Sequence, residues 1–317
     1  MKPIATLVAV AAVMVGAAAA QAQTRVTYKS AGSGTSYYQM GVQIAEALRV
    51  AAGDTLSVTI EESQGSVQNV MEVMGRTGAY VFTTPPALIT AAQNGTGAFE
   101  GRDNPRFDEI RALFPIPAIS MHFVMRADSD VTSIEDLGGT TLLIGRGTFG
   151  ANEAARYLEL FGLTDSVTLA DVELSNAVPA LRNRQIDGFV TASSFPAPNV
   201  IEAAAGGGVR ILSMAEEQVA ATGAQRLVIP AGTYDGQTED IITTSLPVIV
   251  YTTTDMDDDT AYTMTRVFWE SLDDMAETAS WWRGVSTDLI GAITTQIHPG
   301  AVRFYDEIGV PLADVHR

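Results

Sequence analysis

The fold is decided by the stretch Lys29-Ser30-Ala31-Gly32-Ser33-Gly34-Thr35-Ser36-Tyr37-Tyr38-Gln39-Met40-Gly41. A strand-like run, Val26 to Lys29, enters it, and apolar residues then recur every four positions, at Met40, Ile44 and Leu48, which predicts a helix. The loop between them has glycines for a sharp turn and hydroxyls for a helix cap. Because the first amides of a helix lack intrahelical partners and carry partial positive charge, this loop predicts a binding site for a small anion.

The loop matches no standard nucleotide motif. The dinucleotide fingerprint needs glycine at its sixth position, where Tyr37 stands, and no Gly-Lys-Ser/Thr follows. An ordinary strand-to-helix turn therefore remains an alternative. Tyr37 and Tyr38 favour a ligand, since a phenol offers a stacking face and a hydrogen bond. Which of the two faces the ligand depends on the phase of the helix.

The first 22 residues have the pattern of a sorting signal. Lys2 is the charged start, Ile4 to Ala20 is apolar, and Ala20-Gln21-Ala22 is a cleavage site of the A-x-A type. We therefore expect residues 1–22 to be a cleaved signal peptide and the product to be periplasmic. The chain has no cysteine, which excludes a lipobox anchor, disulfides and thiolate metal sites. We see no second apolar run that is long enough to span a bilayer.

The composition limits the partners. The formal net charge is −18, and it becomes −19 when the signal peptide leaves with Lys2. Such an acidic chain repels nucleic acid and anionic lipid headgroups, so we expect neither as a partner. An anionic ligand would have to be held by local dipoles and a few placed cations. The remaining length suits one large domain or two ordinary ones.

Two further units repeat the order strand, loop, helix. The alternating strand Thr55 to Glu61 leads to the loop Gln64-Gly65-Ser66 and then to a helical stripe of apolar residues. The buried strand Ala79 to Phe82 ends in Thr83-Thr84, and Pro86 to Gln93 is expected to be the next helix. Three units in a row are typical of an α/β sheet.

The same order recurs later in the chain. The strand Thr140 to Ile144 leads to the glycine-rich loop Gly145 to Gly150 and a helix over Asn152 to Phe161. A strand over Val167 to Leu174 ends at Ser175-Asn176, and the strand before Thr191 leads to the loop that contains Ser193. Ligands bind beyond the carboxyl ends of strands in open α/β sheets, so two such lobes face to face predict a cleft lined by six loops.

Two apolar segments are expected to cross between the lobes. They are Ile110 to Met125, which Pro115 and Pro117 should interrupt, and Thr244 to Thr252, which contains Pro247. We therefore predict an α/β fold of two lobes. Lobe I comprises residues 24–117 and 247–317, and lobe II comprises residues 118–246.

The chain resembles the substrate-binding proteins of TRAP transporters in the TAXI branch (TRAP-associated extracytoplasmic immunogenic proteins). The resemblance rests on Gly32-Ser33-Gly34-Thr35-Ser36-Tyr37-Tyr38, Gly65-Ser66-Val67-Gln68-Asn69, Asn94-Gly95-Thr96-Gly97, Asp136-Leu137, Gln185-Ile186-Asp187, His298-Pro299-Gly300-Ala301 and Phe304-Tyr305. It implies a type II-like periplasmic-binding-protein fold with crossing hinge segments. It also implies a monomer that delivers a small solute, often a carboxylate, to TRAP membrane permease subunits driven by an ion gradient.

The second lobe departs from the family pattern. The family usually has Ser-Gly-Thr near the start of the helix, where this chain has Phe149-Gly150-Ala151. The guanidinium group of Arg146 is the candidate to replace the lost hydroxyls in binding the ligand. The alternative is that Arg146 is an ordinary loop arginine that faces solvent. The departure leaves the identity of the solute open.

We expect the ligand-binding residues to come from the loops of both lobes. They are Ser33, Gly34, Thr35, Tyr37, Tyr38, Gln64, Gly65, Ser66, Thr83, Thr84, Arg146, Thr148, Phe149 and Ser193.

The sequence gives little support to catalysis or to a metal site. It has no Gly-x-Ser-x-Gly elbow and no His-Glu-x-x-His. A calcium loop starting at Asp255 would need glycine at Thr260 and glutamate at Arg266, so we expect this acidic run to cap the next helix. His298 is expected to cap a helix, and His122 to be packed and hydrogen-bonded.

We therefore expect a binding protein without cofactor or metal. An exported enzyme on the same fold is one alternative, for which no convincing general base is visible. A subunit that docks on a membrane receptor when loaded is the other.

Overall fold

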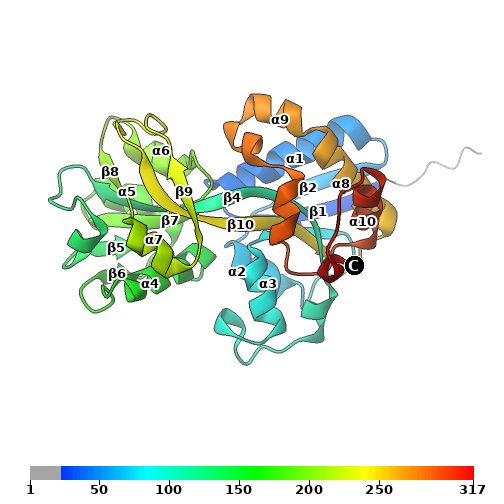
Figure 1. Ribbon diagram of the computed structural model, residues 1–317, viewed down its shortest axis with the longest axis horizontal. Coiled ribbons are helices and arrows are strands. Elements are labelled where there is room, and N and C mark those ends of the chain that lie inside the picture. The colour runs from blue at the N-terminus through cyan, green and yellow to red at the C-terminus, as the bar shows by residue number, and fades with distance from the viewer. Residues whose placement is uncertain (1–22) are drawn as a thin grey trace, which may run out of the picture.

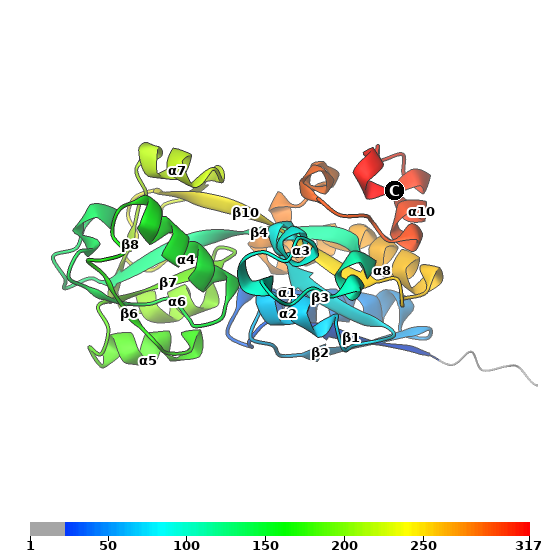
Figure 2. The same cartoon turned by 90° about the horizontal axis from the view of Figure 1, so that it is seen from below.

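The computed structural model describes residues 23–317, and the predicted signal peptide, residues 1–22, lies outside them. Two lobes lie side by side in Figure 1 and are joined by two long strands, β4 (Ile110–Arg126) and β10 (Ile241–Thr253). The view from below shows the same two strands running from one lobe into the other (Figure 2). No helix in the described residues is long and apolar enough to cross a membrane.

Lobe I begins with three strand–helix units, as the sequence predicted. They are β1 (Thr24–Lys29) with α1 (Ser36–Ala52), β2 (Leu56–Glu61) with α2 (Ser66–Glu72), and β3 (Tyr80–Thr84) with α3 (Pro86–Gln93). β1 lies between β2 and β3 and is parallel to both, with Val26 opposite Val58 and Tyr28 opposite Val81. Short 3-10 segments follow at Gly97–Phe99 and Pro105–Glu109.

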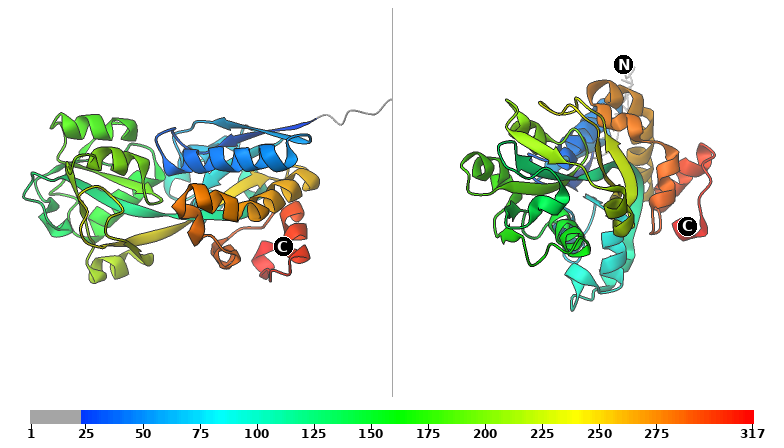
Figure 3. Two further views of the ribbon diagram at one scale, coloured as in Figure 1. Left: turned by 90° about the horizontal axis from the view of Figure 1, so that it is seen from above. Right: turned by 60° about the vertical axis from the view of Figure 1, so that its left-hand side comes forward.

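Parallel neighbours place the carboxyl ends of these strands at one edge of the sheet. The loop before α1 and the loop before α2 therefore emerge at the same edge. α1 covers one face of the sheet, while α2 and α3 pack together on the other (Figures 1 and 3).

The two crossing strands pair with each other, and β4 is longer than the sequence suggested. We expected Pro115 and Pro117 to interrupt it, but the strand runs through both. Here β4 pairs with β10 on one side, with Pro115 opposite Ile249, and its pairing with β7 starts only at Ser120. Proline lacks the N–H of the ladder and is tolerated where one edge is open, so the expectation of an interruption was wrong.

Lobe II contains the remaining short strands. They are β5 (Thr141–Leu143), β6 (Thr168–Ala170), β7 (Gly188–Ser193), β8 (Val209–Leu212) and β9 (Gln225–Ile229). Its helices are α4 (Phe149–Leu160), α5 (Ala177–Arg182), α6 (Pro198–Ala204) and α7 (Glu216–Thr222), with 3-10 segments at Ile134–Leu137 and Leu174–Asn176. β5 is parallel to β6 and β7, so the loops before α4 and α5 also emerge together.

After β10 the chain returns to lobe I. It forms α8 (Asp258–Glu270), α9 (Leu272–Thr278) and α10 (Pro299–Glu307), with 3-10 segments at Ser280–Gly284, Thr287–Ala292 and Asp314–His316. α8 packs against both α1 and α10, and Figure 3 shows α1 and α8 side by side.

Two predicted helix caps are confirmed. An oxygen of Asp257 accepts the Thr260 N–H at 2.8 Å at the start of α8, and His298 Nδ1 accepts the Gly300 N–H at 3.2 Å at the start of α10. The acidic run before α8 is therefore a capping turn. Among residues 23–317 no group of three or more histidine, aspartate or glutamate side chains is placed to hold a metal ion.

All strands belong to one sheet with the path β2-β1-β3-β10-β4-β7-β5-β6, and the apolar core is divided within it. One cluster lies in lobe I and two lie in lobe II. Phe149 is an exception, because it starts α4 in lobe II and packs in the cluster of lobe I. The sheet thus continues through the crossing strands while each lobe keeps its own core.

Candidate functional site

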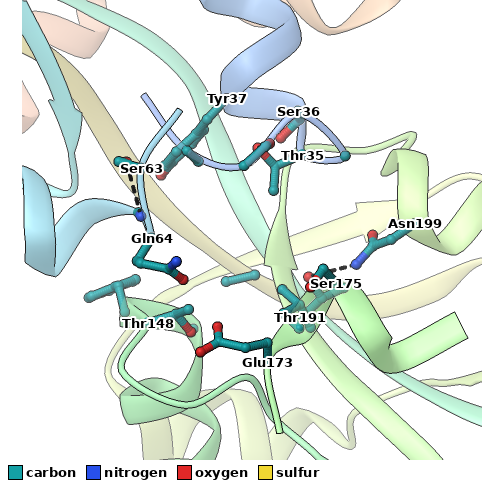
Figure 4. A pocket seen from close by; sticks show the side chains of 18 of the residues that line it. Thr35, Ser36, Tyr37, Ser63, Gln64, Thr148, Glu173, Ser175, Thr191 and Asn199 are labelled. Atoms are coloured by element: carbon teal, nitrogen blue, oxygen red, sulfur yellow. Dashed lines mark hydrogen bonds between the residues drawn. The ribbon is translucent and has the colours of Figure 1, made fainter. Parts of the chain in front are cut away.

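A cavity of about 720 Å³ opens between the two lobes. Its wall comes from the loops before α1, α2, α4 and α5, together with residues of β4, β7 and α6 (Figure 4). Four of its walls are therefore the loops that follow the carboxyl ends of parallel strands, where ligands bind in such sheets.

The start of α1 forms one wall. Thr35 caps the helix: its Oγ1 accepts the Tyr38 N–H at 3.3 Å and donates to the Gly32 carbonyl at 2.7 Å. The N–H groups of Ser36 and Tyr37 have no hydrogen-bond partner among the described residues. Two polarised amides of a 17-residue helix are thus available beside the cavity.

The start of α4 repeats this geometry in lobe II. Thr148 Oγ1 accepts the Ala151 N–H at 3.0 Å and donates to the Gly145 carbonyl at 2.9 Å. The N–H groups of Phe149 and Gly150 likewise have no partner in residues 23–317. A side chain at Gly150 would place its Cβ 3.0 Å from that of Ala192, so only glycine lets α4 approach β7 this closely. The Gly-x-Gly-Thr sequence therefore builds the same capped helix start twice.

The phase of α1 turns Tyr37 rather than Tyr38 to the cavity. Tyr37 is 7% exposed and lines the cavity, whereas Tyr38 is half-buried and does not. The Tyr37 hydroxyl is buried and has no hydrogen-bond partner among the described residues. Burial raises the pKa of this phenol well above its usual value, and the nearby Ser66 hydroxyl opposes the shift. A buried hydroxyl without a partner costs free energy, and the neighbouring Ser66 hydroxyl is the group of the cavity wall that can offer one.

The loop before α2 supplies a third wall. Ser63 Oγ accepts the Gly65 N–H at 3.1 Å and donates to the Ser30 carbonyl at 3.0 Å, which fixes the loop. Gly65 has φ 102°, which favours glycine. Gln64 and Ser66 line the cavity from this loop, and Figure 4 shows the Gln64 amide reaching into it.

The charged side chains in the wall are all acidic. Glu62, Glu173 and Glu202 line the cavity, and no lysine, arginine or histidine from the described part of the chain is among its lining residues. Arg146, our candidate for an ion pair with the ligand, does not line it. Its Nε lies 3.0 Å from an oxygen of Asp171, and 60% of its side chain is exposed. Its pairing with a ligand stays a prediction, and it would require Arg146 to leave Asp171.

Three other predicted residues lie beneath the cavity rather than in its wall. Thr83 and Thr84 are fully buried, and Thr83 Oγ1 lies 2.8 Å from the Tyr28 hydroxyl. Ser193 is also buried, and its Oγ lies 2.9 Å from that of Ser36. These hydroxyls hold the wall in place, whereas Ser33, Gly34, Thr35, Gln64, Gly65, Ser66, Thr148 and Phe149 line it.

Several polar lining residues were not among the predicted ligand-binding residues. Ser36, Ser63, Glu173, Ser175, Thr191 and Asn199 are examples. Glu173 and Ser175 follow β6, so their position at the carboxyl end of a predicted strand was the available signal. Asn199 could not be found in this way, because it lies on α6 and reaches Thr191 through a hydrogen bond of 3.3 Å (Figure 4).

Comparison with known proteins agrees with this architecture. The model of the NMT1-like family matches residues 29–309. One solved structure comes from work on glutathione import via GshT and the cystine ABC importer TcyBC of Streptococcus mutans. It is 10% identical, has a TM-score of 0.50, and the match covers 83% of this chain and 96% of that one.

A structure of a protein from Bordetella bronchiseptica RB50 is 15% identical, also with a TM-score of 0.50. That match covers 92% of this chain and 90% of the other. At such identities the likeness shows the fold alone. The predicted fold class is confirmed: the chain has the two-lobed fold of periplasmic solute-binding proteins.

Proposed function

The chain belongs to the NMT1-like family, and from this premise we propose that it is a periplasmic solute-binding protein for a small, carboxylate-bearing solute. The solute occupies the cavity between the lobes, and the loaded protein presents it to a membrane permease. The resemblance to TAXI proteins supports a permease of the TRAP type.

The observation that carries this proposal is the pair of capped helix starts at the cavity. Each threonine cap satisfies one amide of its helix and leaves two others free, at Ser36 and Tyr37 in α1 and at Phe149 and Gly150 in α4. A carboxylate accepts hydrogen bonds from such amides and is favoured by the helix dipole. Within residues 23–317 no cationic side chain lines the wall, so an anionic oxygen depends on these amides together with the hydroxyl and side-chain amide donors of the wall.

The test of capture starts from the purified protein. Native mass spectrometry should show a small molecule that leaves on denaturation, and a thermal-shift screen of carboxylates should raise the unfolding temperature. A binder returns its solute unchanged, so chromatography after long incubation should recover the compound intact. Conversion of the compound would favour the exported enzyme, and no stabilisation by any carboxylate would oppose the proposal.

The type of permease can be tested by its energy source. A TRAP permease uses an ion gradient, whereas the importer associated with GshT is an ABC importer. Uptake of the identified solute into proteoliposomes containing this protein and the TRAP membrane subunits should follow an imposed ion gradient without ATP. Uptake that needs ATP and ABC subunits would assign the protein to the other class.

The location follows from the predicted signal peptide. The periplasmic fraction of expressing cells should contain a chain that begins near Gln23. Replacing apolar residues of the segment Ile4 to Ala20 with aspartate should leave the uncleaved chain in the cytoplasm.

A further inference from the structure

We infer that a second groove, behind the crossing strands, limits how far the two lobes open. The groove has a volume of about 460 Å³ and shares no lining residue with the solute cavity. One wall is the turn at residues 223–225, which joins α7 to β9 in lobe II. The other wall is the 3-10 segment Thr287–Ala292 in lobe I. We call this feature the rear groove.

The rear groove and the solute cavity lie on opposite sides of the crossing strands. Successive side chains of a strand point to opposite faces, and on β4 Ala118 lines the rear groove while its neighbour Ile119 lines the solute cavity. Figure 2 shows α7, which leads into the groove wall, along one edge of lobe II and α5, which borders the cavity, along the other. A rotation of the lobes that opens the cavity therefore narrows the rear groove.

The floor of the rear groove is a stretch of β10 with a gap in its pairing. On one side, β10 pairs with β9 only as far as Ser245 and with β3 only from Ile249. Among the described strands, β4 alone pairs with β10 between these points, and the register shifts there. Pro247 lies in this stretch and has no N–H to donate. The two walls thus flank the part of β10 that can bend with the least loss of hydrogen bonds.

The two walls are suited to contact each other. Leu289 and Ala292 on one side and Ala224 on the other are half-buried, so part of their apolar surface faces solvent. Asp288 is the one charged side chain among the lining residues of the described chain, so no like charges oppose the approach of the walls. Narrowing the groove removes apolar surface from water, which stabilises the open form. This contact opposes the one that Phe149 makes across the lobes in the structure.

Gly291 keeps the rear groove free. It is an exposed residue of the lobe I wall, a Cβ at this position would meet no atom within 4 Å, and its φ lies outside the left-handed region. A large side chain here can therefore extend into the groove of the structure without strain in the backbone. The same side chain would obstruct the walls when they approach each other. The open form, but not the closed form, thus depends on a small residue at Gly291.

Small-angle scattering without any solute tests the inference in Phe149→Ala, where loss of a closing contact favours the open form. Adding Gly291→Trp should return the radius of gyration most of the way to that of the wild type, because the indole fills the groove. Gln225→Trp, on the exposed rim of the opposite wall, should act in the same way.

Gly284→Trp is the matched control. Gly284 is exposed in another 3-10 segment of lobe I, Ser280–Gly284, and a Cβ there also meets no atom within 4 Å, but it does not line the groove. It should leave the radius of gyration of Phe149→Ala unchanged. Circular dichroism confirms that each variant is folded.

Affinity gives a second measurement, which rests on the proposed function. The probe is the carboxylate that stabilises the wild type most in the thermal-shift screen. Gly291→Trp should raise its affinity for Phe149→Ala at least about threefold, because more of the protein is then in the form that binds.

The outcomes separate the inference from the proposed function. If both groove variants leave the radius of gyration of Phe149→Ala unchanged, or if Gly284→Trp reduces it equally, the inference is overturned while solute capture stands. No expansion in Phe149→Ala itself also overturns it, because there is then no opening to limit. If no carboxylate stabilises the protein, the proposed function fails, and the scattering result still decides the inference.

Discussion

The Ser36 hydroxyl of lobe I lies 2.9 Å from the Ser193 hydroxyl of lobe II. Ser36 Oγ also accepts the Ser194 N–H at 3.1 Å, so one side chain at the start of α1 joins the end of β7. Both serines are buried, with Ser36 1% exposed. The two lobes are thus joined by a hydrogen-bonded pair in addition to the crossing strands.

Ser36→Ala should destabilise the protein through this junction. The change leaves the buried Ser194 N–H without its acceptor, and a buried polar group without a partner costs about 1–3 kcal/mol. Urea unfolding followed by circular dichroism measures the loss. The control is Ser33→Ala, an exposed site three residues earlier, which should change the free energy of unfolding by less than about 0.5 kcal/mol. Equal effects of both changes would refute the structural role of the pair.

The two threonine caps should contribute similarly to the free energy of unfolding. Thr35→Val and Thr148→Val each remove an oxygen that accepts a helix amide, and loss of an N-cap costs about 0.5–2 kcal/mol. Both should also weaken solute binding, because the free amides beside them lose their fixed direction. Thr35→Ser and Thr148→Ser keep the oxygen and serve as controls. If calorimetry gives unchanged affinity for both valine variants, the helix starts are not the anion-binding site.

Tyr37→Phe should weaken binding without destabilising the fold. The Tyr37 and Tyr251 hydroxyls are both buried and have no hydrogen-bond partner within residues 23–317, but of the two only Tyr37 lines the cavity. Removing either hydroxyl should leave stability unchanged or raise it. A hydrogen bond to a charged ligand group is worth about 1.5–3 kcal/mol, so Tyr37→Phe should lose about ten- to a hundredfold in affinity. Tyr251→Phe is the matched control and should bind as the wild type does.

Local patterns in the sequence were enough for most of the fold and for the shape of the loops. The preference of proline for a helix start predicted α3 at its observed bounds, and capping chemistry predicted the roles of the acidic run before α8 and of His298. The course of β4 through Pro115 was missed because a strand tolerates proline only where one edge is open. Which edge is open depends on partners distant in sequence.

The candidate site likewise has a part that local sequence predicts and a part that it does not. Backbone turns and caps are local, so the loops before α1, α2 and α4 were predicted to form the site and do line the cavity. Side-chain direction and side-chain pairing depend on tertiary contacts. Arg146 is paired with Asp171 and Thr83 is fully buried, and neither follows from spacing. The sign of the charge in the wall was therefore the least predictable property of the site.

Stability should fall as the pH falls from about 6.5 to 4 because of His122. Burial lowers the pKa of this histidine to about 4, from an unfolded value near 6.5. Its Nδ1–H donates to the Ser120 carbonyl at 3.1 Å, and its Nε2 accepts the Tyr234 hydroxyl at 2.8 Å, so the neutral ring is the form that fits.

The sign of the effect follows from that pKa. The unfolded chain binds the proton first, so the stabilisation by neutral His122 is complete above pH 6.5 and is lost towards pH 4. The loss approaches about 1.4 kcal/mol per pH unit. Urea unfolding at pH 7 and pH 5 should show a smaller difference for His122→Gln than for the wild type. Burial also lowers the pKa of His298, so the variant should keep part of the slope. An identical slope in both proteins would exclude this role of His122.

Closure of the lobes on the solute should depend on Phe149. This side chain starts α4 in lobe II, yet it is 8% exposed and packs in the apolar cluster of lobe I. Only a closed arrangement buries it there, and burying a phenylalanine contributes about 1.5–3 kcal/mol. Bending should concentrate where β10 shifts its register against β4, between Leu246 and Val248 around Pro247.

Phe149→Ala should therefore favour the open arrangement. Small-angle scattering without solute should give a larger radius of gyration than for the wild type, and saturating solute should bring the two values together. Because the solute must then supply the lost closing energy, its affinity should fall about ten- to a hundredfold. Leu160→Ala, at the exposed end of the same helix, is the control and should change neither quantity. If Phe149→Ala leaves both the scattering and the affinity of the wild type, the lobes are a rigid unit and solute recognition by closure has to be abandoned.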